Sequence, residues 1–128
     1  MTIKDIDIQI LEIFTSAKKY KEENAEIFYQ IDDRTKLYLT QSDNVFQLCI
    51  YLGVQDYYHG DKLGPSTEFQ CEGANYIDFQ FQDDSLIINQ ETPWSSKLGK
   101  KVNLNSLEEI VLFLRQEWKD YNNLPKNK

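Results

Sequence analysis

The only histidine of the chain, His59, is the side chain best suited to acid–base chemistry near neutral pH. It lies in the stretch "VQDYYHGDKLGPSTEFQCEG", residues 54–73, where Asp56 and Asp61 could orient its ring. The chain contains no nucleophile signature such as GxSxG, so nothing completes a catalytic set around this histidine. We predict that the protein is not an enzyme, and that His59 is a surface residue.

Metal and phosphate chemistry also lack their usual patterns. Cys49 and Cys71 are 22 residues apart without a CxxC motif, and no acidic run has the spacing of a calcium loop. Glycine-rich phosphate loops are absent too. We therefore predict no cofactor and no metal. The two cysteines are interpreted as free thiols of a reducing compartment, with a disulfide as the open alternative.

The negative charge of the chain is concentrated in its middle. The net charge is −7 overall, but residues 37–96 contain nine acids and the single base Lys62, a net of −8. Residues 97–128 carry a net of +3. Such asymmetry favours a cationic partner, and the alternative is an acidic surface that only maintains solubility. An isoelectric point near 4.7 argues against direct nucleic-acid binding, despite the small patch at Lys97, Lys100 and Lys101.

Membrane insertion and secretion are not expected. The longest apolar runs, at 48–52 and 110–114, are far shorter than the roughly 20 residues that span a bilayer. The N-terminal "MTIKDIDIQILEIF" lacks the basic and uninterrupted apolar regions of a secretory signal. We predict a cytoplasmic protein that forms one domain over residues 1–128.

The N-terminal segment predicts an amphipathic helix over about residues 4–21. Its apolar side chains recur at helical spacing: Ile6, Ile10, Ile13, Phe14, Ala17 and Tyr20. Lysines between Lys18 and Lys21 would complement the dipole of its last turn. A strand through "IDIQI" is the competing interpretation. Branched and aromatic runs, separated by the turn-forming "DDRT" and "SDN", then predict strands over 26–31, 36–41 and 45–52.

A hairpin is predicted over residues 75–91, with Asp83 and Asp84 as its two-residue loop. In that register Phe81 faces Leu86 and Phe79 faces Ile88. The opposite face of the hairpin would be acidic and rich in amides, with Ile87 as its one aliphatic side chain. It would carry Tyr76, Asp78, Gln80, Gln82, Asn89 and Glu91.

The C-terminal segment predicts a helix capped by Asn105, with Glu108 completing a capping box. Its apolar stripe is Leu107, Ile110, Val111, Leu114, Trp118 and Tyr121. The whole pattern favours an α+β fold: an N-terminal helix, an antiparallel sheet of about five strands and the capped C-terminal helix, with both helices on one face.

Protein binding is the function that these patterns favour. The middle segment interleaves aromatic side chains, which anchor interfaces, with acids that steer a basic partner. For each aromatic the alternative is burial in the core. The predicted partner-binding residues are Asp56, Tyr57, Tyr58, Asp61, Glu68, Glu72, Tyr76, Asp78, Asp83, Asp84 and Trp94.

The acidic stretch from Asp43 to Glu91 and the helix "NSLEEIVLFLRQEW", in an α+β chain without a catalytic set, resemble a bacterial immunity protein. These are the proteins that neutralise contact-dependent growth-inhibition and related polymorphic toxins. The resemblance implies a monomer or weak homodimer that binds a cognate toxin domain, often a basic nuclease, and blocks its active site. Two alternatives remain: a phage-type inhibitor that mimics nucleic acid, and a small-molecule enzyme or carrier with a pocket near His59.

Overall fold

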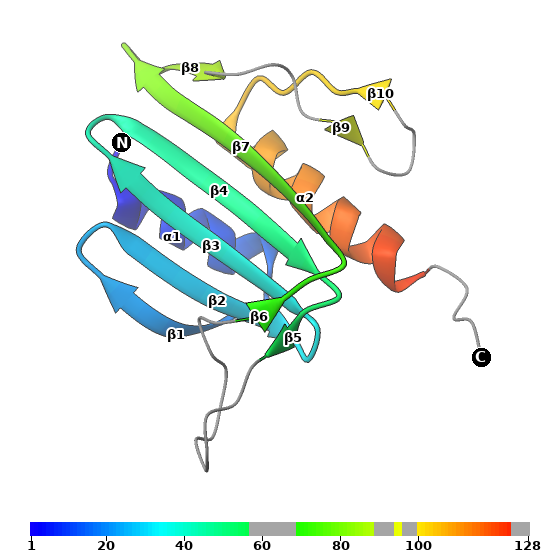
Figure 1. The fold of residues 1–128 in the computed structure, drawn as a ribbon. Coiled ribbons are helices and arrows are strands. Elements are labelled where there is room, and N and C mark those ends of the chain that lie inside the picture. The colour runs from blue at the N-terminus through cyan, green and yellow to red at the C-terminus, as the bar shows by residue number, and fades with distance from the viewer. Residues whose placement is uncertain (57–68, 89–93, 96–99, 124–128) are drawn as a thin grey trace.

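The computed structural model describes residues 1–56, 69–88, 94–95 and 100–123 (Figure 1). Along the chain, the elements are α1 (Ile3–Ile13), β1 (Lys18–Glu23), β2 (Glu26–Asp32), β3 (Thr35–Ser42), β4 (Val45–Leu52), β5 (Gln55–Asp56), β6 (Phe69–Gln70), β7 (Gly73–Gln82), β8 (Ser85–Ile88), β9 (Trp94–Ser95), β10 (Lys100–Lys101) and α2 (Leu107–Asn122).

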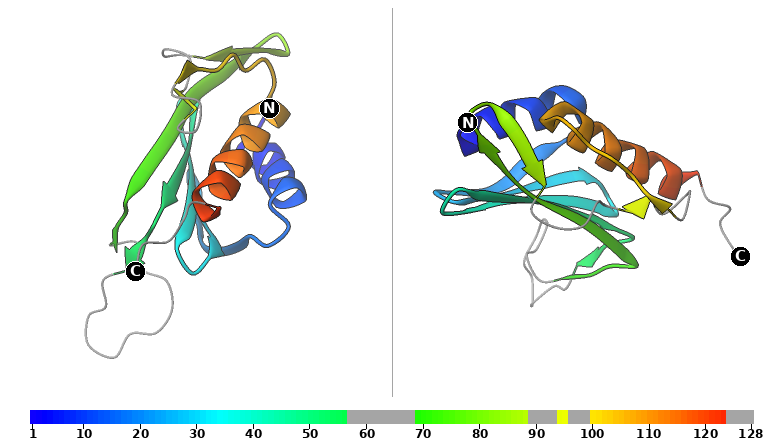
Figure 2. Two further views of the ribbon diagram at one scale, coloured as in Figure 1. Left: turned by 90° about the vertical axis from the view of Figure 1, so that its right-hand side faces the viewer. Right: turned by 90° about the horizontal axis from the view of Figure 1, so that it is seen from above.

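Six strands form one antiparallel sheet in the order β1-β2-β3-β4-β7-β8. Two small two-stranded sheets, β5–β6 and β9–β10, accompany it. The two helices lie side by side on one face of the main sheet, and no helix of the described residues covers the other face (Figure 2). The predicted α+β fold is therefore confirmed, with six strands in the main sheet.

The predicted hairpin is confirmed in register by β7 and β8. Phe81 pairs with Leu86 and Phe79 pairs with Ile88. Both loop residues have left-handed backbones, with φ of 50° at Asp83 and 65° at Asp84. Two positive φ angles are the geometry of the tight turn whose twist matches a right-handed hairpin, and Asp tolerates them better than most residues.

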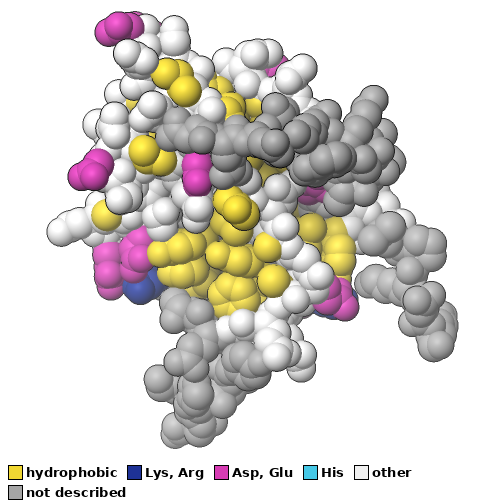
Figure 3. All heavy atoms as spheres, turned by 45° about the horizontal axis from the view of Figure 1, so that its top comes forward, with side chains coloured by type: hydrophobic (Ala, Val, Ile, Leu, Met, Phe, Trp, Pro, Cys, Tyr) yellow, Lys and Arg dark blue, Asp and Glu magenta, His cyan; other side chains and the backbone are white. Residues whose placement is uncertain are grey.

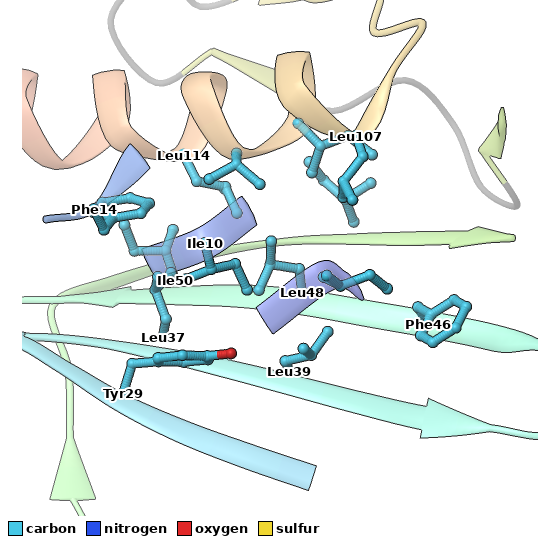
Figure 4. Close-up of a cluster of buried hydrophobic side chains, with 14 of the residues drawn as sticks. Ile10, Phe14, Tyr29, Leu37, Leu39, Phe46, Leu48, Ile50, Leu107 and Leu114 are labelled. Carbon is cyan, nitrogen blue, oxygen red and sulfur yellow. The ribbon is translucent and has the colours of Figure 1, made fainter. Parts of the chain in front are cut away.

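The hydrophobic core lies between the two helices and the inner face of the sheet (Figure 4). Ile10 and Phe14 from the α1 segment meet Leu107 and Leu114 of α2 above the strands. The sheet contributes side chains at every second position, as strand geometry requires: Ile27, Tyr29 and Ile31 from β2, Leu37 and Leu39 from β3, Phe46, Leu48, Ile50 and Leu52 from β4, and Ile77 and Phe79 from β7.

The predicted helix over 4–21 is wrong after Ile13, where α1 ends. Thr2 and Asp5 form a reciprocal capping box at its start. The lysines that were expected in its last turn lie instead on β1, which pairs with β2. Tyr20 continues the helical spacing only by coincidence, because it lies at a bulge in β1, where the register shifts between Lys19 and Lys21. Strand pairing therefore overrides the apparent helical periodicity in this segment.

The start of α2 is one residue later than predicted. Ser106, not Asn105, is the N-cap, and its hydroxyl accepts a hydrogen bond from the backbone N–H of Glu109 at 3.1 Å. The Glu109 carboxylate accepts in turn from the backbone N–H of Asn105 at 2.7 Å. The predicted apolar stripe does face the core, because its first four members are buried and Trp118 and Tyr121 pack against them.

Neither helix of the described residues is long and apolar enough to cross a bilayer.

Candidate functional site

The side chains that alternate with the core residues point to the side of the sheet that carries no helix, here called the outer face. Cross-strand pairing places Phe28, Tyr38, Cys49 and Tyr76 side by side across four strands. Hydrophobic side chains gather on this face, with carboxylates beside them (Figure 3). The outer face is therefore a mixed aromatic and acidic surface, more apolar than the acidic, amide-rich face expected from the hairpin alone.

An aromatic cluster occupies the part of the outer face formed by the first three strands. The rings of Phe28 and Tyr38 are stacked with centroids 4.0 Å apart, and Tyr20 lies 5.5 Å from Phe28. The bulge in β1 places Tyr20 there, because bulge geometry turns its side chain to the same side as that of Lys21. This cluster buries Phe28 to 8% exposure, so it forms a second apolar layer on the sheet.

Lys36 is completely buried within this outer layer. Its Nζ donates a hydrogen bond to Gln30 Oε1 at 2.9 Å and lies 4.4 Å from the centroid of the Tyr20 ring. The ring of Phe69, from β6, lies 5.5 Å from the same Nζ and 4.9 Å from the ring of Tyr51. Cation–π contacts and a hydrogen bond thus compensate for the loss of hydration at the buried ammonium.

Sequence reasoning missed this layer, although a signal for it exists. The runs "IFY" in β2, "LYL" in β3 and "LCIYL" in β4 place apolar residues at consecutive positions. Continuous apolar runs are typical of strands that are buried on both faces. Nothing local to "TKLYL" indicates the burial of Lys36, which depends on Tyr20 and Phe69.

Five residues of the predicted loop, Tyr57, Tyr58, His59, Asp61 and Glu68, lie outside the described residues. For two further predicted contact residues, the structure describes the strand pairing of the backbone but not the side chain. Asp56 pairs with Phe69 between β5 and β6, and Trp94 pairs with Lys101 between β9 and β10. Their roles stay predictions.

Glu72, another predicted contact, interacts with residues of its own chain. Its Oε1 lies 3.1 Å from a guanidinium nitrogen of Arg34 and accepts a hydrogen bond from the hydroxyl of Tyr121. That hydrogen bond raises the pKa of Tyr121. The contact also requires Gly53, which has a φ of 66°, because a Cβ at Gly53 would overlap the Glu72 carboxylate. Glu72 therefore ties the start of β7 to α2 and is already neutralised.

Tyr76 and Asp78, by contrast, share the outer face on one strand, β7. They are two residues apart on β7, so both side chains point outward, and the Tyr76 side chain is 50% exposed. Asp78 is half-buried, and its Oδ1 accepts a hydrogen bond from Gln47 Nε2 at 2.8 Å. No Lys or Arg of the described residues pairs with Asp78. The turn residues Asp83 and Asp84 are likewise exposed and have no described cation.

Two carboxylates at the far end of the sheet line an open hollow at the β1–β2 turn. Glu23 and Glu26 form its wall together with Thr40. Glu26 accepts hydrogen bonds from the Tyr38 hydroxyl at 2.6 Å and from Lys21 at 2.9 Å, and these contacts lower the pKa of Glu26. Burial, followed by the bond to Glu26, raises the pKa of Tyr38 to about 12. The hollow is therefore partly neutralised by Lys21.

A buried polar group that sequence reasoning did not identify lies on the core-facing side of α1. Asp7 is 4% exposed and accepts hydrogen bonds from the Tyr29 hydroxyl at 2.8 Å and from Lys19 Nζ at 2.9 Å. Lys19 also contacts Glu22 at 3.2 Å. The pKa of Tyr29 is raised, first by burial and then by the bond to Asp7. These contacts join the helix to β1 and β2 within the core, so we assign them a structural role.

The cysteines are free thiols in different environments. Cys49 is buried on β4, and burial raises the pKa of its thiol to about 11. Cys71 is exposed, just before β7. In the described part of the chain, no three His, Cys, Asp or Glu side chains are grouped so that they could hold a metal ion.

Comparison with protein-family models, curated proteins and solved structures finds no significant match to this chain.

Proposed function

We propose that this protein is a non-enzymatic immunity protein of the bacterial cytoplasm, which binds and neutralises a cognate basic toxin domain. The contact surface would be the outer face of the sheet at β7, together with the acidic segment between β5 and β6. The observation that carries the proposal is the pair formed by Tyr76 and Asp78, a half-exposed aromatic ring beside a carboxylate without a described cation.

The distribution of charge supports a basic partner. Residues 37–96 carry a net charge of −8. Among the acids of this segment whose side chains are described, Glu72 is paired with Arg34. Asp43, Asp78, Asp83 and Asp84 have no such pairing within the described residues. Their charge is thus available to attract a cationic surface and to accelerate association with it.

The composition of the outer face supports a protein partner over a small ion. Interfaces combine aromatic anchors with a polar rim, and tyrosine is one of the residues most enriched at their energetic centres. Tyr76 is one of the four large hydrophobic residues with substantial exposure among the described residues, and it is the one that lies on the outer face. The stacked rings of Phe28 and Tyr38 lie on the same face of the sheet as Tyr76 and extend its aromatic surface.

The proposal is tested by co-expressing the chain with the toxin domain encoded beside its gene and measuring growth. The double variant Tyr76→Ala with Asp78→Lys should lose protection and weaken binding of the purified toxin domain. Glu12→Lys is the matched control, because it makes the same charge change on an exposed helix position away from the outer face. That control should protect as well as the wild type.

The thermal unfolding temperature of each variant shows whether it is still folded, so that a loss of binding can be told from a loss of folding. Unchanged protection, affinity and salt dependence in the Tyr76/Asp78 variant would contradict the proposed surface. The absence of any toxic protein encoded beside the gene, combined with turnover of a small molecule that His59→Ala abolishes, would favour the enzyme alternative instead.

A further inference from the structure

Within the described residues, two sites bring a cation of the protein into contact with both an aromatic ring and a carboxylate. In the first, the guanidinium of Arg34 lies 5.9 Å from the centroid of the Tyr121 ring and 3.1 Å from Glu72 Oε1. The ring offers the negative face of its π system and the carboxylate offers a full charge. The arginine is therefore held by two different attractions at once.

The second site follows the same plan with a lysine on the outer face. Lys21 Nζ lies 5.6 Å from the centroid of the Phe28 ring and 2.9 Å from Glu26 Oε1. The ring and the carboxylate come from one strand, β2, at positions two residues apart that share a face. A strand of this protein can thus present a ring and a carboxylate to one cation.

Tyr76 and Asp78 repeat that arrangement on β7, at the same spacing and on the same face. The carboxylate is oriented, because Asp78 Oδ1 is fixed by Gln47 Nε2 at 2.8 Å. The second oxygen, Oδ2, has no hydrogen bond or ion pair to any described residue. The ring is half exposed, so it has surface to offer. In the described part of the chain, this is a ring–carboxylate pair whose carboxylate has no cation.

We propose that Tyr76 and Asp78 form a receptor for one arginine side chain of the partner protein. This inference rests on the proposed function and adds to it the chemical group that the surface recognises. Arg34 on Tyr121 is the precedent within the chain. A guanidinium is planar, stacks on an aromatic ring and still presents N–H donors at its edge to a carboxylate, whereas an ammonium is a compact and strongly hydrated charge.

The occupant is an arginine of a basic protein and not of a second copy of this chain. Tyr76 and Asp78 belong to residues 37–96, which carry a net charge of −8, so two copies that met through β7 would repel each other. The same charge attracts the basic surface that the proposed toxin would present.

The receptor can be tested without the toxin, by titrating the isotope-labelled protein with acetyl-Gly-Arg-Gly-amide and following its amide resonances. Two matched peptides carry citrulline, which keeps the shape but not the charge, or lysine. We expect saturable shifts centred on Tyr76, Asp78 and Gln47 with the arginine peptide. We expect none with citrulline and weaker binding with lysine.

Three variants assign the effect to side chains. Asp78→Asn and Tyr76→Leu should each weaken binding of the arginine peptide by about threefold or more, as expected for one ion pair or one cation–π contact. Asp84→Asn is the control, since it removes a neighbouring charge and asparagine tolerates the left-handed backbone there. The Asp84→Asn variant should bind the arginine peptide with the same affinity as the wild type.

Equal binding of the lysine and arginine peptides, or equal weakening by Asp84→Asn, would overturn the arginine receptor in favour of a general electrostatic effect. Shifts that centre away from β7 would also overturn it. These results are separate from the test of the proposed function. A toxin neutralised without arginine binding refutes only the receptor, and arginine binding without any toxin refutes only the immunity function.

Discussion

Replacing Tyr29 with phenylalanine removes one hydroxyl from the centre of the protein and nothing else. The Tyr29 side chain is fully buried, and its hydroxyl donates to Asp7 at 2.8 Å. The ring remains, so no cavity forms. The variant loses one hydrogen bond to a buried carboxylate, a loss that amounts to about 1.5–3 kcal/mol when the partner is charged. Asp7 keeps its contact with Lys19, which favours a value of about 2 kcal/mol.

That loss corresponds to a measurable shift in thermal stability. For 128 residues, an unfolding entropy of about 2.1 cal/mol/K per residue converts it to a fall in Tm of about 7 °C. Urea titration followed by circular dichroism gives the free energy of unfolding directly. Tyr38→Phe is the matched comparison: its hydroxyl also donates to a carboxylate, Glu26, but from a half-buried position. It should cost less, about 0.5–1 kcal/mol.

The pH dependence provides a second readout of the same hydroxyl. Burial and the bond to Asp7 raise the pKa of Tyr29 above its ordinary value of 10.0. A group whose pKa is raised by folding stabilises the folded state fully at any pH below its pKa in the unfolded chain. This contribution is lost as the pH rises from that value toward the pKa in the folded protein. Above pH 10, wild-type stability should therefore fall more steeply than that of Tyr29→Phe, by up to about 1.4 kcal/mol per pH unit. Equal stabilities at pH 7 and equal slopes above pH 10 would refute the buried hydrogen bond.

Three further substitutions or reactions test other features. Ser106→Ala should lower the free energy of unfolding by about 1 kcal/mol, because it removes the N-cap of α2. Asn105→Ala should change it by less than about 0.5 kcal/mol, and the reverse order in urea titrations would restore Asn105 as the cap. Gly53→Ala should cost at least about 1–2 kcal/mol, because φ is 66° and a Cβ would overlap Glu72, and a neutral result by the same titration would show that this contact does not form. In thiol labelling of the native protein, the exposed Cys71 should react first. The buried Cys49, with a pKa of about 11, should react only on unfolding, and equal rates would contradict its burial.

The hairpin of β7 and β8 could be predicted to the residue, because neighbouring residues in the sequence determine its strands and its turn. The strand register, and the face of the sheet to which each side chain points, follow from two local features. These are the alternation in "NYIDFQFQ" and "SLII" and the Asp83–Asp84 pair between them. The end of α1 was not predictable in this way. Residues after Ile13 continue a helical spacing, and only pairing with β2, further along the chain, makes Lys18–Glu23 a strand. In that segment, pairing with a distant strand determines the secondary structure, and the local helical pattern does not.

In the candidate site, too, some features follow from the local sequence and others depend on contacts between distant residues. Exposure of Tyr76 and Asp78 follows from alternation along one strand, so sequence reasoning could place them on a face. The neutralisation of Glu72 by Arg34 joins residues 38 positions apart, and no local pattern reports it. Burial of Lys36 likewise depends on a bulge in β1 and on Phe69 from β6. Contacts of this kind determine which acids remain available to a partner.

The bulged, lysine-bearing edge strand β1 limits how any partner can bind. An open sheet edge is a template for strand addition, which is also the route to domain swapping and fibrils. Lysines at positions 18, 19 and 21 and the bulge at Tyr20 interrupt that template at one end of the sheet. At the other end, β8 spans four of the described residues, Ser85–Ile88. The proposed recognition of another protein would thereby use side chains on the face of the sheet, where specificity can be changed one residue at a time without altering the backbone that supports it.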